Sequence, residues 1–244
     1  MKKLIPSSLR LYLRVLQRNL IDLSNTRQIK FAGFQQVSEK EKQLFKPQIS
    51  LSQAILPTQY SENKKHNLSL AIERIQDVVI QPGTIFSFWH LVGKPDQAKG
   101  YREGRSLIAN QLKTELGGGL CQLSGLLYFL TLKAGLSTLE RHPHSQDIYT
   151  DSTRFAPLGS DATVVYGYKD FRFQNNLLFP ICFRFSLQED EISATLCSPQ
   201  PIPQYQVEFK VEDFNGEAKV DTVRFLHQTS TVEVLNSTIY KKLI

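Results

Sequence analysis

Three consecutive glycines lead into a cysteine in the stretch Glu115-Leu-Gly-Gly-Gly-Leu-Cys-Gln-Leu-Ser124. A glycine run costs backbone entropy, so a compact domain keeps one where a left-handed turn or a close approach of backbone requires it. A helical pattern begins at Cys121 and ends at Gly135, a residue type that commonly terminates helices. A cysteine on the first turn of a helix lies at the positive end of the helix dipole, which favours the thiolate. We therefore expect either a nucleophile or a ligand-binding turn here.

The flanking sequence predicts an α+β fold. Amphipathic or apolar helical patterns cover residues 7–23, 63–75 and 121–134. Alternating or short apolar runs predict strands over residues 85–89, 147–149, 161–166, 181–187, 192–197, 205–211, 219–226 and 231–235. We expect the helix that begins at the glycine turn to pack on a mainly antiparallel sheet, as papain-like and transglutaminase-like cores do.

Composition divides the chain into three parts. Residues 1–60 are predicted to hold an amphipathic helix and a linker, residues 61–197 a central domain, and residues 198–244 a β extension. The proline-rich run Ser198-Pro-Gln-Pro-Ile-Pro203 marks the second boundary, because such a run is stiff and extended.

Positive charge is concentrated at the start of the chain. The net charge is +6, and the first 50 residues hold ten Lys or Arg against three Asp or Glu, a balance of +7. The helix over residues 7–23 is expected to pack on the domain or, alternatively, to contact an anionic membrane surface. Basic residues without interleaved aromatics argue against nucleic acid as a partner. Neither a secretory signal nor an apolar spanning segment is evident, so the expected location is the cytoplasm, with peripheral contact at the inner membrane face as an option.

Three residue types that support nucleophilic catalysis follow one another along the chain. Cys121 is the candidate nucleophile, and either His142 or His144 is a candidate base; we favour His144, because a predicted strand follows it. Asp161 is the candidate acid that would orient the imidazole. The non-functional alternatives are that the cysteine is a buried residue at a tight packing point, that the histidines are ordinary core or surface residues, and that the acid caps a turn.

Substrate contacts are expected close to the cysteine. Amides of the glycine turn could stabilise an oxyanion, and small or polar side chains on the helix and beyond could hold a substrate. The candidates are Gly117, Gly118, Gly119, Gln122, Ser124 and Tyr166. Cys182 and Cys197 lie in strand-like apolar runs and are expected to be inert core residues. No phosphate loop, dinucleotide fingerprint or metal-ligand spacing occurs in the sequence, so we expect no metal and no cofactor.

Several motifs resemble those of the VanW family, whose name comes from an accessory protein of glycopeptide-resistance clusters. They span roughly residues 60–186 and include Gln81-Pro-Gly-Thr-Ile-Phe-Ser-Phe88, Gly117-Gly-Gly-Leu-Cys-Gln-Leu-Ser124, Glu140-Arg-His-Pro-His-Ser145, Gly159-Ser-Asp-Ala-Thr163 and Asp170-Phe-Arg-Phe-Gln-Asn175. The resemblance implies a link to the cell envelope or to antibiotic resistance, and it does not supply a reaction.

Two functional hypotheses follow. The first is a cysteine-dependent acyl-transfer enzyme, such as an amidase, peptidase or transpeptidase, acting on a peptide or cell-wall substrate. The second is a non-catalytic domain that binds peptidoglycan or an envelope precursor, with the glycine turn and the His/Asp cluster shaping the binding pocket.

Overall fold

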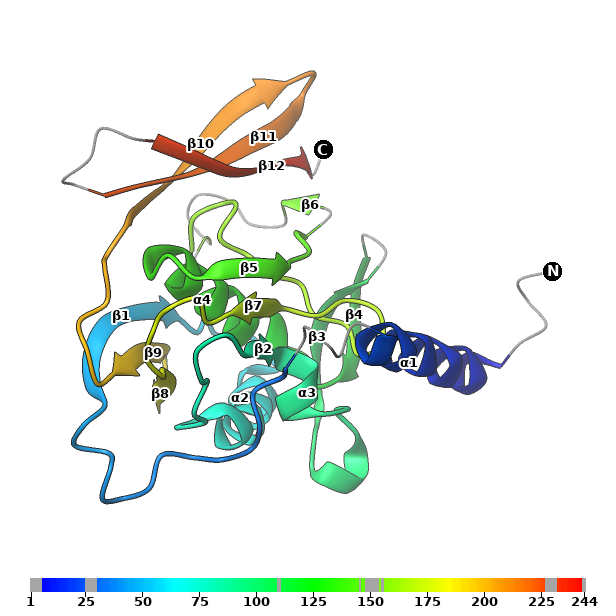
Figure 1. The fold of residues 1–244 in the computed structure, drawn as a ribbon. Coiled ribbons are helices and arrows are strands. Elements are labelled where there is room, and N and C mark those ends of the chain that lie inside the picture. Colours follow the sequence, from blue (N-terminus) through cyan, green and yellow to red (C-terminus); the bar gives the residue numbers. More distant parts are fainter. Residues whose placement is uncertain are drawn as a thin grey trace.

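The structure is a computed structural model, and it describes residues 6–24, 30–108, 111–144, 146–147, 154, 156–226 and 232–242. Its helices are α1 (Ser7–Ser24), α2 (Ser61–Ile75), α3 (Phe88–Val92), the short 3₁₀-helix η1 (Gln97–Lys99) and α4 (Leu120–Lys133). Its strands are β1 (Lys46–Ala54), β2 (Ile85–Ser87), β3 (Glu103–Ile108), β4 (Gln111–Leu116), β5 (Ser137–Glu140), β6 (Gln146–Asp147), β7 (Arg172–Gln174), β8 (Cys182–Leu187), β9 (Glu191–Ser198), β10 (Gln206–Phe214), β11 (Glu217–Phe225) and β12 (Val232–Lys242). Figure 1 shows their arrangement.

The strands form small, mainly antiparallel sheets. One has the order β1-β9-β8, a second β2-β7-β5, and a third β10-β11-β12-β6; β3 and β4 form a separate hairpin. The pairing of β12 with β6 is parallel, whereas the other named strand pairs are antiparallel. The predicted α+β class with mainly antiparallel sheets is therefore confirmed.

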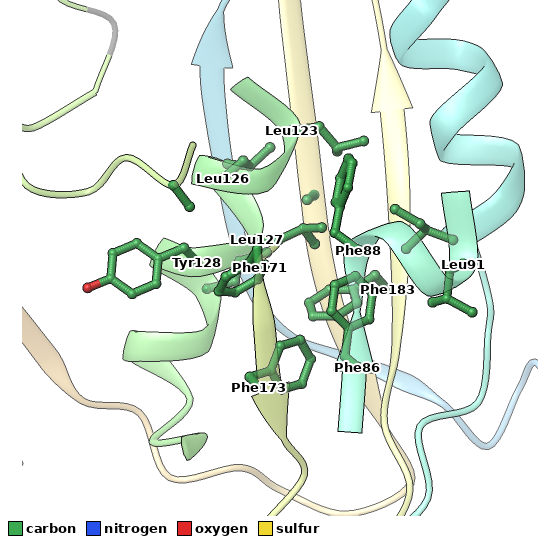
Figure 2. Close-up of a cluster of buried hydrophobic side chains, with 14 of the residues drawn as sticks. Phe86, Phe88, Leu91, Leu123, Leu126, Leu127, Tyr128, Phe171, Phe173 and Phe183 are labelled. Atoms are coloured by element: carbon green, nitrogen blue, oxygen red, sulfur yellow. The ribbon is translucent and has the colours of Figure 1, made fainter. Parts of the chain in front are cut away.

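Helix α4 lies at the centre of the domain and contacts β1, β5 and β9. Because its residues are apolar or small around the whole circumference, nearly every side chain between Leu120 and Leu132 is buried. Figure 2 shows Leu123, Leu126 and Leu127 of this helix among phenylalanines of neighbouring segments, including Phe88 of α3. Truncating a fully buried phenylalanine of such a cluster typically costs about 3–5 kcal/mol of folding free energy. The core therefore holds the start of α4 in a fixed position.

Aromatic residues form the other side of this core. Phe86 stacks on Phe173, with ring centroids 4.9 Å apart, and meets Phe183 edge-on. These rings come from β2, β7 and β8, so the cluster joins two of the sheets (Figure 2).

Two differences from the predicted strands have identifiable causes. The strand expected over 85–89 stops at Ser87, whose hydroxyl caps α3 by accepting from the His90 amide at 3.2 Å. The prediction of a strand over residues 161–166 is wrong, because this segment forms no strand. The carbonyls of Asp161 and Ala162 accept from side chains of Arg141 and Ser124, so they are not available to a strand ladder.

The segment predicted as linker contains β1, which pairs with β9 along its length and so belongs to the sheet behind α4. The strand expected over 147–149 begins as β6, and residues 148–149 lie outside the described residues. The helix predicted over 121–134 is confirmed as α4, and Gly135 follows it with a positive φ of 69°.

Candidate functional site

The triple glycine forms the tight turn between β4 and α4. Gly117 and Gly119 have φ angles of +79° and +100°, a region that side chains with a Cβ rarely adopt. Gly118 is needed for a different reason: a Cβ there would lie 2.2 Å from the carbonyl carbon of Gly104. Both expected uses of the glycines, a left-handed turn and a close backbone approach, are present.

A buried asparagine on α2 holds this turn in place through hydrogen bonds to its backbone. Asn67 is fully buried, and its amide nitrogen donates to the carbonyls of Gly118 and Arg102 at 3.0 and 2.9 Å. Its carbonyl oxygen accepts from the Arg102 amide at 2.8 Å. No local pattern in the sequence marks Asn67, because its partners are 35 and 51 residues away.

The turn leaves two amides unused at the start of the helix. The amides of Gly117, Gly118, Leu120 and Gln122 donate to backbone carbonyls, namely those of Arg102, Glu115, Gly117 and Gly119 in that order. Within the part of the chain that the structure describes, the amides of Gly119 and Cys121 donate to no acceptor. Free amides at a helix N-terminus favour an anion.

Cys121 lies on the first turn of α4 and is partly exposed, unlike the other two cysteines. Its Sγ is 3.8 Å from the carbonyl oxygen of Val164. Cys182 and Cys197 are fully buried and lie opposite each other on β8 and β9, as expected for core residues. Cys121 is therefore the accessible thiol of the chain.

His144 and Asp161 are bound to each other beside this sulfur. The backbone N–H and the Nδ1–H of His144 both donate to Asp161 Oδ2, at 2.5 and 2.8 Å. Because an ionised carboxylate only accepts hydrogen bonds, this contact places a proton on Nδ1. Burial lowers the pKa of His144, but its interactions with Asp161 and Cys121 outweigh burial and raise that pKa to about 10. A protonated imidazole beside a cysteine is a setting that stabilises a thiolate.

The second oxygen of Asp161 is held by two further groups. Oδ1 accepts from Arg141 Nη2 at 3.0 Å and from the Tyr240 hydroxyl. Burial opposes the ionised form of Asp161, but its interactions with His144 and Arg141 prevail and hold its pKa well below the usual range. Arg141 also donates to the carbonyls of Gly159 and Asp161. The carboxylate is thus fixed in orientation, which in turn fixes the imidazole.

No role was predicted from the sequence for two of these supporting residues, Arg141 and Tyr240. Arg141 directly precedes the histidine motif, so its place in the chain was a usable signal. Tyr240 lies on β12, 79 residues from Asp161, and only the fold brings the two together. The β extension therefore completes the support of this site.

His142 is directed to a different partner. Its Nε2 lies 2.9 Å from Glu140 Oε1, and it does not line the cavity beside Cys121. Burial opposes ionisation of Glu140, yet bonds from His142 and Arg18 lower its pKa to about 2. Of the two candidate histidines, His144 is the one that the structure brings to Cys121 and Asp161.

A cavity of about 960 Å³ opens beside the sulfur. Of the residues predicted to carry out chemistry or to bind substrate, those that line it are Cys121, His144, Asp161, Gly117, Gly118, Gly119, Gln122 and Tyr166. Tyr166 meets Trp89, another lining residue, edge-on with ring centroids 5.6 Å apart. A space of this size suits a small molecule or several residues of a peptide.

Two lining glutamines carry buried oxygens without partners. Gln122 donates through Nε2 to the Ala54 carbonyl at 2.9 Å, but its Oε1 accepts no bond from the described residues. Gln53 Oε1 on β1 is in the same situation, and both residues are only 5% exposed. A buried unpaired acceptor costs about 1–3 kcal/mol of folding free energy. Gln53 was not among the predicted site residues.

Ser124 lies away from the lining. It is fully buried, and its hydroxyl donates to the Ala162 carbonyl at 2.6 Å. This bond connects α4 to the segment that carries Asp161, which gives Ser124 a positioning contact. Gly125, one residue on, does line the cavity.

Lys64 adds a cation to the cavity wall. Its side chain crosses the glycine turn so closely that a Cβ on Gly119 would lie 2.5 Å from Lys64 Cγ. Burial lowers the pKa of this ammonium to about 8.

Among the residues that the structure describes, no group of three or more His, Cys, Asp or Glu side chains is arranged to hold a metal ion. The described helices include none that is long and apolar enough to cross a bilayer.

The family model described as VanW like protein matches residues 63–197, more than half of the chain. The chain belongs to the VanW family. It is 35% identical over 142 residues to the uncharacterized protein YoaR of Bacillus subtilis (strain 168). The aligned region covers 58% of this chain and 45% of YoaR. It is 31% identical over 149 residues to the vancomycin B-type resistance protein VanW of Enterococcus faecalis (strain ATCC 700802 / V583). The aligned region covers 61% of this chain and 54% of that protein.

The matches therefore span about half the length of these curated relatives. The matched range of the family model runs from α2 to the end of β9 and contains Cys121, His144 and Asp161. No solved structure matches the chain.

Proposed function

We propose that this VanW-family domain is a cysteine-dependent acyl-transfer enzyme. The observation that supports it best is the convergence of Cys121, the His144–Asp161 pair and two unused amides on one cavity. A nucleophile, an oriented imidazole and donors for an oxyanion are the groups that acyl transfer needs.

In this mechanism the thiolate of Cys121 attacks the carbonyl carbon of an amide. The amides of Gly119 and Cys121 donate to the oxygen as it becomes negative, and Lys64 adds positive charge nearby. The C–N bond then breaks, the leaving amine takes a proton from the His144 imidazolium, and a thioester remains on the enzyme. Water or a second amine attacks the thioester, His144 accepts its proton, and the thiolate is released.

The substrate we propose is a peptide of the cell envelope. The relative named as a vancomycin B-type resistance protein links the family to glycopeptide resistance. The aromatic side chains of Trp89 and Tyr166 line the cavity and supply apolar contacts for such a substrate. An association of this chain with resistance is part of the same proposal.

Alkylation of the thiols tests the nucleophile. We expect Cys121 to react with iodoacetamide near neutral pH at least about tenfold faster than free cysteine. The buried Cys182 and Cys197 should react only after denaturation, so peptide mass spectrometry assigns the rate to one residue. His144→Gln should slow the reaction, whereas His142→Gln should leave it near the wild-type rate. A Cys121 no faster than free cysteine would instead favour a binding domain.

Incubation with purified cell-wall peptides tests the reaction. Product formation, followed by mass spectrometry, should disappear in Cys121→Ala and persist in Cys182→Ala, provided that both variants fold. Unchanged turnover in Cys121→Ala would refute the proposed chemistry.

A further inference from the structure

Helix α1 is attached to the domain by one narrow stripe of side chains. Leu11, Val15, Arg18 and Asp22 recur at helical spacing, and these residues are the less exposed positions of the helix. A Cβ on Gly167 would lie 2.7 Å from Leu11 and 3.1 Å from Val15, which shows how closely these two side chains approach the domain.

The two polar residues of this stripe form ion pairs with the domain. Arg18 Nη2 lies 2.6 Å from Glu140 Oε2. The two carboxylate oxygens of Asp22 accept hydrogen bonds from Nη1 and Nη2 of Arg172, at 2.8 and 2.9 Å. A bidentate pair fixes direction as well as distance, so the helix has one defined orientation. In Figure 1, α1 lies along one side of the domain, with its N-terminal end pointing away from the sheets.

The opposite face of α1 is apolar and open. Its large side chains are between 41% and 64% exposed: Leu9, Tyr12, Leu13, Leu16 and Leu20. The sequence pattern identified this apolar arc, and the structure turns it outward instead of into the core. Soluble proteins seldom expose a continuous apolar row without a partner for it.

Charge along the helix indicates which partner fits. Arg10 and Arg14 are exposed beside the apolar row, and no acidic residue precedes Asp22 in the chain. Because Asp22 is paired with Arg172, the exposed side of the helix presents only positive charge. An apolar row flanked by arginines matches the interface of an anionic lipid bilayer, where acyl chains and negative headgroups occur together.

We propose that the outer face of α1 docks on an anionic membrane surface, with Leu13, Leu16 and Leu20 inserted and Arg10 and Arg14 at the headgroups. Leu11, on the inner face of the same helix, lines the cavity beside Cys121. Docking would therefore bring the cavity close to the bilayer. This proposal rests on α1 alone and does not depend on the chemistry proposed for Cys121.

Co-sedimentation with lipid vesicles tests it. We expect binding to vesicles of equal parts phosphatidylglycerol and phosphatidylcholine at low salt, much weaker binding to pure phosphatidylcholine, and release by salt. Leu13→Glu/Leu16→Glu should weaken binding about tenfold or more, because each leucine contributes apolar burial. Arg10→Glu/Arg14→Glu should weaken binding to anionic vesicles by a similar factor.

Matched controls separate docking from general effects. Leu178→Glu changes an apolar side chain that is 94% exposed elsewhere, and Lys40→Glu/Lys46→Glu reverses two exposed charges outside the helix. Both variants should bind vesicles as the wild type does, and so should Cys121→Ala. The circular dichroism and Tm of the helix variants should match the wild type, because the changed side chains face solvent.

Two results would overturn the proposal. One is an absence of binding to the anionic vesicles at low salt. The other is binding that Leu13→Glu/Leu16→Glu leaves unchanged. A dimer seen by analytical ultracentrifugation and broken by the same double variant, without vesicle binding, would assign the face to self-association instead.

Discussion

The backbones of Gly104 and Gly118 are in direct contact, so that a Cβ at Gly118 would fall 2.2 Å from the carbonyl carbon of Gly104, and one at Gly104 would fall 2.9 Å from the Gly118 oxygen. This contact brings the β3–β4 hairpin against the turn that starts α4. It explains why the middle glycine is required, although it lacks the positive φ that both of its neighbours have.

Gly118→Ala should therefore destabilise the protein by about 3 kcal/mol or prevent folding, because both clashing partners are backbone and cannot rotate away. The free energy of unfolding in urea measures this effect. Gly33→Ala is the control, since a Cβ there meets nothing within 4 Å and its φ is not positive. Equal stability of the two variants would show that the backbone contact is not tight.

Local sequence was sufficient for the helix and its turn, but not for the groups that support the site. The glycine run, Cys121 and Gly135 lie within one segment, so their pattern predicted α4 and its start. Tyr240 and Asn67 act across large sequence separations, and no periodicity reports a contact of that kind.

The helix over residues 7–23 shows the limit of periodicity in another way. The apolar arc was identified from the sequence, but whether an arc faces core or solvent depends on what packs against it. Here the ion pairs of Arg18 and Asp22 decide the orientation, and these pairs join residues more than 100 positions apart. Amphipathicity alone could not reveal them.

Protonation of His144 predicts how stability changes with pH. Its pKa is raised to about 10 in the folded protein, against about 6.5 in an unfolded chain, so the stabilisation is complete below about pH 6.5 and is lost as the pH rises towards 10. The pKa of Asp161 is lowered, so its contribution is present above about pH 4 and is lost in acid. Together they contribute most between about pH 4 and 6.5.

Thermal unfolding across this pH range gives the measurement. The Tm of His144→Gln should lie furthest below that of the wild type in the weakly acidic range, and the gap should narrow as the pH rises from about 6.5 to 10. His142→Gln serves as the comparison outside the cavity. A gap that is constant with pH would contradict an elevated His144 pKa.

Tyr240→Phe tests whether the β extension supports the site. The change removes the hydroxyl that donates to Asp161 Oδ1 but keeps the buried ring. The hydroxyl also accepts from Arg141 Nη2 at 2.8 Å, so the change removes two hydrogen bonds to charged groups. Losing each should cost about 1.5–3 kcal/mol of stability, and alkylation of Cys121 should slow because Asp161 would hold His144 less firmly. Tyr205→Phe, on a tyrosine that does not line the cavity, is the control for the alkylation rate. Identical alkylation rates for the wild type and Tyr240→Phe would remove Tyr240 from the set of positioning residues.

Gln53 and Asn67 are both buried amides, but only one is fully paired, and this contrast gives a prediction in two opposite directions. Gln53 Oε1 has no partner among the described residues, whereas both polar atoms of Asn67 are bonded to the backbone of Arg102 or Gly118. Gln53→Met should therefore leave the Tm of the free protein unchanged or raise it, because it removes an unpaired acceptor. Asn67→Leu should lower the Tm strongly, because it leaves buried backbone groups unpaired. If Gln53→Met destabilised the free protein as much as Asn67→Leu does, the Gln53 amide would be a structural group, which contradicts an unpaired oxygen at this position.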